Sequence, residues 1–534
     1  MPGEKWHMKM KIKYTTICQL VKITIMKHIL FSIALSSLAS LATAQIYTDA
    51  ILFNQNTYEG TARSLAMGSA FGSLGADLSS AVINPAGLAR YRSSDASLSL
   101  GINFDTAESS YYNFTFENDK VSVPFNNIGA AFHSRPMAEN QNKLQGFTFS
   151  ISYNRLADYN QSTIYKDMYG YNSMLDFFCM EENINNPYSG GLAYDAKFIY
   201  DAYIEDGIEN MMTHNVWEAP YGEGQFDKMA REDADGVGLV DHEQSVKQRG
   251  SKGELLFGTA WNICNTLYIG GSFGIQTLNY NEKKNHYEQY YGIPLNGITT
   301  DFTYRTEIDQ DGSGVNFKIG AIYQPIPYIS IGFALHSPTF FSIEEYYSTS
   351  ITNAETGYFE NKQIGEYEYN YRSPGRFVAS ASGLIGKFGI ISFDYERCNY
   401  SKSKFKEKEH EVEGTLYFYT NNDIKNNLKA VNIMRVGLEA KLNEQFSLRA
   451  GYKFSTSPLE ENYVHTQDMK HSAFSGGIGY KFSNIYIDFA YINSQKEGEN
   501  WVLPDSGNYI YELNEPATYK SRSNNFILTA GFRF

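Results

Sequence analysis

The last ten residues of the chain are Asn525-Phe-Ile-Leu-Thr-Ala-Gly-Phe-Arg-Phe534. In an extended strand, successive side chains point to opposite faces. One face of this segment carries Phe526, Leu528, Ala530, Phe532 and Phe534, and the other carries Asn525, Thr529, Gly531 and Arg533. The segment therefore predicts a β-strand with one apolar and one polar face, ending on an aromatic residue.

A terminal strand of this kind resembles the carboxy-terminal assembly signal of bacterial outer-membrane β-barrels. The resemblance implies that Phe532 and Phe534 belong to the signal and that the barrel assembly machinery recognises it. A membrane location is therefore the first hypothesis that the rest of the chain must support.

Thirteen earlier segments show the same alternation. They are residues 96–104, 127–133, 147–153, 255–262, 267–276, 315–324, 328–336, 377–385, 391–395, 434–442, 446–454, 474–482 and 485–491. A strand of about 10 residues is long enough to cross a bilayer when it is tilted. The sequence predicts an all-β fold, a 14-stranded antiparallel transmembrane β-barrel with apolar side chains facing lipid.

The connections between these segments alternate between long and short. Outer-membrane barrels have short periplasmic turns and long extracellular loops, whereas a soluble sandwich has no reason to keep such an alternation. An even strand count also places both ends of the barrel in the periplasm. Within the long connections, residues 111–116 are assigned to a loop and residues 309–314 to a tight polar turn.

Composition excludes several other classes of protein. Phe and Tyr are abundant, and aromatic residues make up 15% of the chain, which suits strands and the interfacial girdles of barrels. The net charge of −14 argues against binding of nucleic acid. We find no nucleophile, metalloprotease, phosphate-loop or dinucleotide motif in a suitable setting, so we expect no enzyme activity, no cofactor and no metal.

The amino-terminal residues 1–44 resemble an export signal. Met26-Lys27-His28 is a short basic start, residues 29–41 are apolar, and Ala42-Thr43-Ala44 fits a small-residue cleavage site. We expect the true start at Met26; the alternative is a long basic segment before the apolar one. Either way, the mature protein begins near Gln45 and is exported to the cell envelope.

Residues 45–93 do not alternate like a strand series and are rich in Gly and Ala. Small residues let backbones approach closely, so a compact segment of this kind could pack inside a barrel lumen. We call residues 45–93 the hatch, and residues 94–534 the barrel.

Three hatch motifs resemble the FadL/OmpP1 family of outer-membrane transporters, in the form found in Bacteroidetes-type bacteria. They are Arg63-Ser-Leu-Ala-Met-Gly68, Gly75-Ala-Asp77-Leu-Ser-Ser80 and Asn84-Pro85-Ala86-Gly87-Leu88. The resemblance implies passive uptake of hydrophobic molecules, long-chain fatty acids first. It also implies capture at extracellular loops, movement of the hatch, and lateral release into the membrane through a gap at a kinked strand.

Glycine within strands often marks a bulge, so Gly129 and Gly146 are candidates for the kink. Expected partners are the hydrophobic ligand, outer-membrane lipid and lipopolysaccharide, and we expect a monomer. The alternatives on the same scaffold are uptake of haemin or aromatic hydrocarbons, a barrel enzyme, and a surface or adhesin barrel that transports nothing.

The connection 154–253 is too long for a structureless loop, so we expect it to fold or to cap the mouth of the barrel. Met174, Phe177, Phe178, Met211 and Trp217 could form a hydrophobic capture surface there. The alternative is that these side chains pack the loop against itself.

Lumen cations are a further candidate site. Arg435, Arg449 and Lys453 could attract a ligand carboxylate, or they could neutralise Glu439 and similar groups across the lumen.

Overall fold

The computed structural model describes most of the barrel and the hatch. The described residues are 43–57, 60–135, 144–170, 174, 239–291, 301–353, 359–386, 388–408, 417–460, 469–500, 502 and 517–534. The predicted signal peptide lies outside them except for its last two residues. None of the helices in this part of the chain is long and apolar enough to span a membrane.

The described chain contains nineteen strands in one sheet. They are β1 (Asp95–Tyr111), β2 (Phe114–Ser122), β3 (Phe125–Ser134), β4 (Leu144–Asp158), β5 (Gln161–Gly170), β6 (Leu239–Ile263), β7 (Leu267–Tyr291), β8 (Phe302–Ile326), β9 (Ile329–His336), β10 (Phe340–Asn353), β11 (Phe359–Arg372), β12 (Arg376–Ile385), β13 (Gly389–Asn399), β14 (Lys404–Glu407), β15 (Ala430–Lys441), β16 (Phe446–Ser455), β17 (His471–Phe482), β18 (Ile485–Asn500) and β19 (Ala517–Arg533). The helical segments are α2 (Thr43–Asn54), α3 (Ala62–Ala66), α4 (Ser80–Ile83), η1 (Pro85–Arg90), η4 (Tyr400–Lys402) and α8 (Phe418–Asn427).

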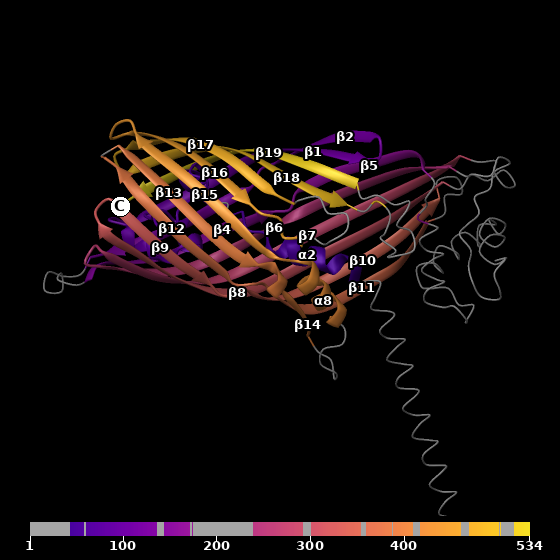
Figure 1. The fold of residues 1–534 in the computed structure, drawn as a ribbon, viewed down its shortest axis with the longest axis horizontal. Coiled ribbons are helices and arrows are strands. Elements are labelled where there is room, and N and C mark those ends of the chain that lie inside the picture. The colour runs from indigo at the N-terminus through magenta and orange to yellow at the C-terminus, as the bar shows by residue number, and fades with distance from the viewer. Residues whose placement is uncertain are drawn as a thin grey trace, which may run out of the picture.

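These strands form a closed antiparallel barrel with fourteen positions, as predicted (Figure 1). Five positions are each shared by two consecutive strands: β2 and β3, β4 and β5, β9 and β10, β11 and β12, and β13 and β14. The last strand closes the ring by pairing with the first, from Asp95 opposite Arg533 to Ser110 opposite Thr518. Closure leaves no unpaired sheet edge at the join.

The inversion of polarity that a membrane barrel requires is clearest in β9. Ile329, Ile331, Phe333 and Leu335 are 38–53% exposed, while the alternate residues Ser330, Gly332, Ala334 and His336 are buried. The apolar side chains therefore face outward toward lipid, and small or polar side chains face the lumen.

This pattern reverses along β7, and the reversal marks the edge of the membrane. Ile269 and Ile275 point outward, but beyond Ile275 the exposed positions are polar, and apolar Leu278 and Tyr280 are among the buried ones. The strands β6, β7 and β8 thus continue past the lipid-facing belt as an extracellular extension (Figure 1).

The extension corrects two predictions. Residues 309–314 lie within β8 and not in a turn, and most of the expected loop 278–313 is strand. Similarly, residues 111–116 form the end of β1 and the start of β2. The prediction failed because polar residues alternate outward there, where the wall faces water and not lipid.

The hatch fills the lumen. Between Gly60 and Tyr91 every side chain is buried except for Arg63, Leu65, Ala76 and Arg90, which are partly buried. Its backbone rests directly on inward-facing glycines of the wall. A Cβ atom at Gly320 of β8 would lie 1.9 Å from Asn84 Oδ1, and one at Gly451 of β16 would lie 2.1 Å from the Gly68 nitrogen.

We therefore expect Gly320→Val to displace the hatch without preventing closure of the barrel. The added side chain needs the space that Asn84 occupies, so protease should cut within residues 60–91 of the folded, detergent-solubilised protein. Gly271→Val is the matched control, because a Cβ there meets nothing nearer than the Lys318 oxygen at 3.5 Å. A Gly320→Val hatch as resistant as that of the control would show that the hatch does not rest on this glycine.

Candidate functional site

The Asn84-Pro85-Ala86 segment is the turn that joins α4 to η1. The Asn84 side chain accepts a hydrogen bond from the Ala86 N–H (3.1 Å) and donates one to the Gly72 carbonyl (2.6 Å). It also reaches the Ala321 carbonyl on β8 at 3.4 Å. One side chain thus caps η1, ties two parts of the hatch together and contacts the wall, which explains why a short amide is needed here.

Asp77 organises the other end of the hatch. Both its carboxylate oxygens accept from the Thr61 hydroxyl, at 2.8 and 2.9 Å, and one also accepts from the Ser79 N–H (2.9 Å). Gly68 has a φ of +63°, a left-handed conformation that glycine adopts without strain, and its N–H donates to Ser475 Oγ on β17 (3.1 Å).

Ion pairs attach the hatch to the wall. Arg63 Nε lies 3.1 Å from Glu439 Oε2, and Arg449 Nε lies 2.8 Å from the same oxygen. Arg449 also pairs with Asp488 at 2.6 Å. Arg435 pairs with Glu396 at 2.6 Å. Arg435 and Arg449 therefore neutralise lumen carboxylates, as one of the two sequence interpretations held.

An apolar cluster lies above the packed residues 60–91 of the hatch, in the extracellular half of the lumen, and includes helix α2 of the hatch; we call it the upper core. Helix α2 contributes Phe53, whose ring meets Tyr371 edge-on with centroids 5.2 Å apart, and Tyr371 in turn packs on Phe405 at 4.9 Å. The members are Ala50, Ile51, Phe53, Ala157, Tyr159, Leu278, Tyr280, Phe341, Ile343, Tyr369, Tyr371, Cys398, Tyr400, Phe405, Ile424, Leu428, Val431, Ile433 and Leu459. This part of the lumen is therefore filled by mutually packed apolar side chains.

A basic cavity lies at the carboxyl end of α2, directly below Phe53. Lys252 Nζ donates to the carbonyl oxygens of Phe53 (2.7 Å) and Gln55 (2.5 Å), and Arg376 Nη2 donates to the Asn54 carbonyl (2.5 Å). Cationic side chains are favourable at a helix carboxyl end, where carbonyl groups lack helical partners. The barrel wall therefore holds α2 in place through two cations.

The charges around this cavity do not balance evenly. Arg376 pairs with Glu396 (2.7 Å) and Lys318 with Glu254 (2.6 Å), while Lys252 bonds to carbonyl oxygens within the described chain. The cavity has a volume of about 20 Å³. That volume holds about one water molecule, so a larger group can enter only if α2 moves.

Within the lipid-facing belt, the described wall is interrupted between β2 and β3. β2 and β3 together form one position of the barrel, but Val123-Pro124 separates them, and the Gly101 N–H donates to the Pro124 carbonyl (3.0 Å). Proline cannot donate to a ladder. Pairing of β1 with β3 skips Asn126, and pairing of β3 with β4 begins only at Asn127, opposite Asn154.

Above that point, β2 has a ladder with β1 and none with β4 or β5 in the described chain; a side-chain bond joins β2 to β5 there. Asn118 Nδ2 on β2 donates to Ser162 Oγ on β5 (2.9 Å). Val121 and Val123 are 61% and 74% exposed, so this wall break faces lipid.

The predicted kink residues lie close to irregular pairing but not at the wall break itself. Gly129 lies in β3 and pairs regularly with Ser97 and Ser152. Gly146 follows a register shift at Gln145, near the start of β4. Pro124 was not among the predicted kink residues, although a proline inside an otherwise strand-like run marks an interruption in the sequence.

The predicted capture surface is mostly beyond the described residues. Phe177, Phe178, Met211 and Trp217 lie outside them. Met174 is described, and it is 4% exposed, so it does not form part of an exposed surface. Its N–H donates to Glu288 Oε1 on β7 (2.6 Å), because this point of the chain docks on the extracellular extension.

The predicted assembly residues lie on the outside of the closed barrel. Phe532 and Phe534 are 48% and 56% exposed, and their rings stack with centroids 6.0 Å apart. The Phe534 N–H donates to the Ser94 carbonyl (3.0 Å), which extends the join between the two ends of the barrel. Their recognition by the assembly machinery stays a prediction.

Comparison with known proteins agrees with this architecture. A family model described as outer membrane protein transport protein (OMPP1/FadL/TodX) matches residues 252–534. A solved FadL homologue from Pseudomonas aeruginosa is 12% identical with a TM-score of 0.52, covering 89% of this chain and 98% of that one. At this identity the likeness shows the fold alone.

Two further solved structures are less similar. The toluene transporter TodX of P. putida is 12% identical with a TM-score of 0.49, covering 89% of this chain and 99% of that one. The toluene transporter TbuX of Ralstonia pickettii is 13% identical with a TM-score of 0.46, covering 89% and 99%. No curated protein sequence matches the chain significantly.

Proposed function

The chain belongs to the outer membrane protein transport protein family (OMPP1/FadL/TodX) of Gram-negative outer membranes, and we propose that it carries long-chain fatty acids passively into the cell. The observation that carries this proposal is the position of the basic cavity directly below the upper core. A fatty acid has an apolar tail and one carboxylate, and this part of the lumen offers a place for each.

The acyl tail of a fatty acid gains free energy through the hydrophobic effect. Each buried CH₂ group contributes about 0.8 kcal/mol on leaving water, so a long acyl chain is favoured strongly in the upper core. A neutral aromatic hydrocarbon would gain from the same surface but would leave Lys252 bonded to carbonyl oxygens, whereas Arg376 already has Glu396 as an anion. The basic cavity therefore favours a fatty acid over an aromatic hydrocarbon.

The carboxylate could couple binding to movement of the hatch. Lys252 and Arg376 hold the carbonyl groups at the end of α2, and a carboxylate is a stronger acceptor for both cations. When a ligand carboxylate takes these donors, α2 loses its two cationic attachments at this end and keeps the bond from the Tyr400 hydroxyl to the Asn54 carbonyl (3.1 Å). Release of α2 also opens the small cavity to the ligand head group.

Exit through the wall break would follow. The backbone ladder between β2 and β5 is already missing there, so the opening needs side chains to move but no ladder to break. Asn126 and Asn127 are buried at the lumen side of the break, and an oxygen of each has no hydrogen-bond partner in the described chain. A passage at this height delivers an apolar ligand sideways into lipid.

Other functions on the same scaffold make different demands. Haemin carries two carboxylates and a rigid ring, and needs more space than the tail of a fatty acid. A barrel that transports nothing needs no movable hatch, and an enzyme needs a converging nucleophile and base. Oleate, haemin and toluene binding to the purified protein would rank the transport alternatives, with oleate expected to bind most tightly.

Replacing Lys252 by Met should weaken oleate binding by about tenfold or more, since a hydrogen bond to a charged group is worth about 1.5–3 kcal/mol. Binding of methyl oleate, which has no charge, should change little. Lys283→Met, at a half-exposed lysine on the outer side of β7, is the matched control. Equal losses for the acid and its methyl ester would refute the assignment of Lys252 to the carboxylate.

A cross-link between hatch and wall should stop uptake. A Cβ at Gly258 of β6 would lie 3.9 Å from Ala81 Cβ in α4, within the range for a disulfide. Its close neighbours, Leu88 Cδ1 and Ser150 Oγ, are the ends of rotatable side chains.

We expect Ala81→Cys/Gly258→Cys to take up oleate when reduced and not when oxidised, in a background with Cys179 and Cys264 changed to Ser. The two single-cysteine variants are the controls. Undiminished uptake by the fully oxidised protein would contradict a moving hatch.

Asn126→Trp should reduce oleate uptake while leaving oleate binding intact, because the larger side chain fills the wall break beyond the binding region. Gln445→Trp, in an exposed periplasmic turn, controls for the change of residue type. Uptake at the control rate by a correctly folded Asn126→Trp protein would place the exit elsewhere.

A further inference from the structure

Three metal-ligating side chains meet on the inner face of the extracellular extension. His242 lies on β6, and His286 and Glu288 lie on β7. His286 and Glu288 are two residues apart on one strand and so share a face, and the β6–β7 ladder places His242 directly opposite Glu288. The cluster lies beyond the lipid-facing belt, which ends at Ile275 on the same strand.

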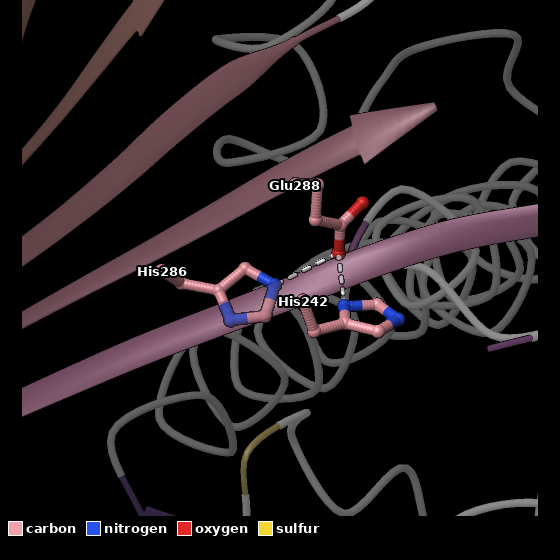
Figure 2. A group of neighbouring side chains, drawn as sticks. All are labelled: His242, His286 and Glu288. Carbon is pink, nitrogen blue, oxygen red and sulfur yellow. Dashed lines mark hydrogen bonds and ion pairs between the residues drawn. The ribbon is translucent and has the colours of Figure 1, made fainter. Parts of the chain in front are cut away.

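Both imidazoles point at one carboxylate oxygen (Figure 2). His286 Nε2 lies 2.8 Å from Glu288 Oε1, and His242 Nδ1 lies 3.4 Å from it. One donor atom from each of the three residues lies within 4.8 Å of the others. The side chains of His242 and His286 are 2% exposed and that of Glu288 is 0% exposed.

The protonation states of the group suit metal binding. Burial lowers the pKa of His286, which favours the neutral imidazole that a metal requires. The pKa of Glu288 is also low. Burial raises this pKa, but hydrogen bonds and charge from the two histidines lower it by more than burial raises it. The carboxylate is therefore ionised, and its Oε1 faces both rings.

We propose that His242, His286 and Glu288 form a binding site for a divalent transition-metal ion, with zinc as the best match. Two imidazoles and a carboxylate are a donor set that zinc accepts in tetrahedral sites, with a fourth position left for water. This proposal does not depend on what the barrel transports.

The observed spacing is close to what zinc needs. Zinc–nitrogen and zinc–oxygen bonds of about 2.0–2.2 Å place tetrahedral ligands about 3.3 Å apart. The His242–Glu288 distance of 3.4 Å already meets this value. The His286–Glu288 distance of 2.8 Å must lengthen by about 0.5 Å, which is within reach of side-chain rotation.

An ion here would join three separate parts of the chain. It would bridge β6 to β7, and through Glu288 it would fix Met174, whose N–H donates to the same carboxylate oxygen at 2.6 Å. Met174 belongs to the long connection between β5 and β6, so the ion would anchor this connection to the wall. The rival interpretation is a proton-mediated His–Glu–His network that needs no metal.

Zinc binding to the full-length mature protein distinguishes the two interpretations. The protein is purified in detergent without a polyhistidine tag, stripped with a chelator and titrated with ZnCl₂ by calorimetry. Co²⁺ is used as a spectroscopic substitute. We expect about one zinc per chain and the intense visible absorption of tetrahedral Co²⁺ with nitrogen ligands.

His286→Ala should weaken zinc binding by at least about tenfold, a loss typical even of outer partners of a metal ligand. Glu288→Gln keeps the size of the side chain and should show the same loss, which guards against misfolding of the alanine variant. His133→Ala is the matched control, since His133 lies on β3 beside Thr148 and away from the cluster.

Three results would overturn the proposal. They are absence of zinc binding by the wild-type protein, equal zinc affinity in the wild type and both cluster variants, and equal loss in His133→Ala. Zinc should also raise the unfolding temperature of the wild-type and His133→Ala proteins but not of folded Glu288→Gln, because only a ligand that binds the native state stabilises it.

Discussion

Every backbone N–H and C=O group in the hydrocarbon layer must find a partner within the protein, and this constraint shapes the whole molecule. The pairing of β1 with β19 satisfies it by closing the ring. Once the ring is closed, apolar side chains such as Leu335 must face lipid, and the inward positions are left to small and polar residues. Those small residues leave room for the hatch to contact the wall, through the Asn84 side chain at Gly320 and through the Gly68 backbone at Gly451.

The places where regular pairing or packing fails are the places that we associate with transport. At Pro124 a strand loses its ladder within the belt, and above it a side-chain bond from Asn118 to Ser162 joins β2 to β5. At the end of α2, two cations of the wall hold helix carbonyls that an anionic ligand could replace. Taken alone, each feature lowers the stability of the fold, since a regular strand or an apolar contact would contribute more to the free energy of folding. A closed barrel is rigid enough to tolerate them.

The sequence predicts those features that depend on local alternation. The fourteen crossings, the closing strand and the hatch follow from residues close together in the chain, such as Phe526 to Phe534 and the Asn84 turn. It does not predict the extension of β6 to β8. Above the membrane the outward positions face water and carry polar residues, so the pattern there no longer resembles that of a lipid-facing strand. Nor does it predict the basic cavity, where Lys252, Arg376 and Phe53 meet from distant segments, or the pairing of His242 with Glu288, which depends on strand register. Gly129 lies in β3 with regular pairing, and the interruption before that strand lies at Pro124.

Our central claim is that a packed hatch blocks the lumen until a ligand loosens it. Amide hydrogen exchange of the protein in lipid nanodiscs, with and without oleate, measures this most directly. The account predicts strong protection of residues 60–91 without ligand, and faster exchange there and at the end of α2 when oleate is saturating, while the barrel strands stay protected. Hatch amides that exchange freely without ligand, or that are unchanged by bound oleate, would contradict it.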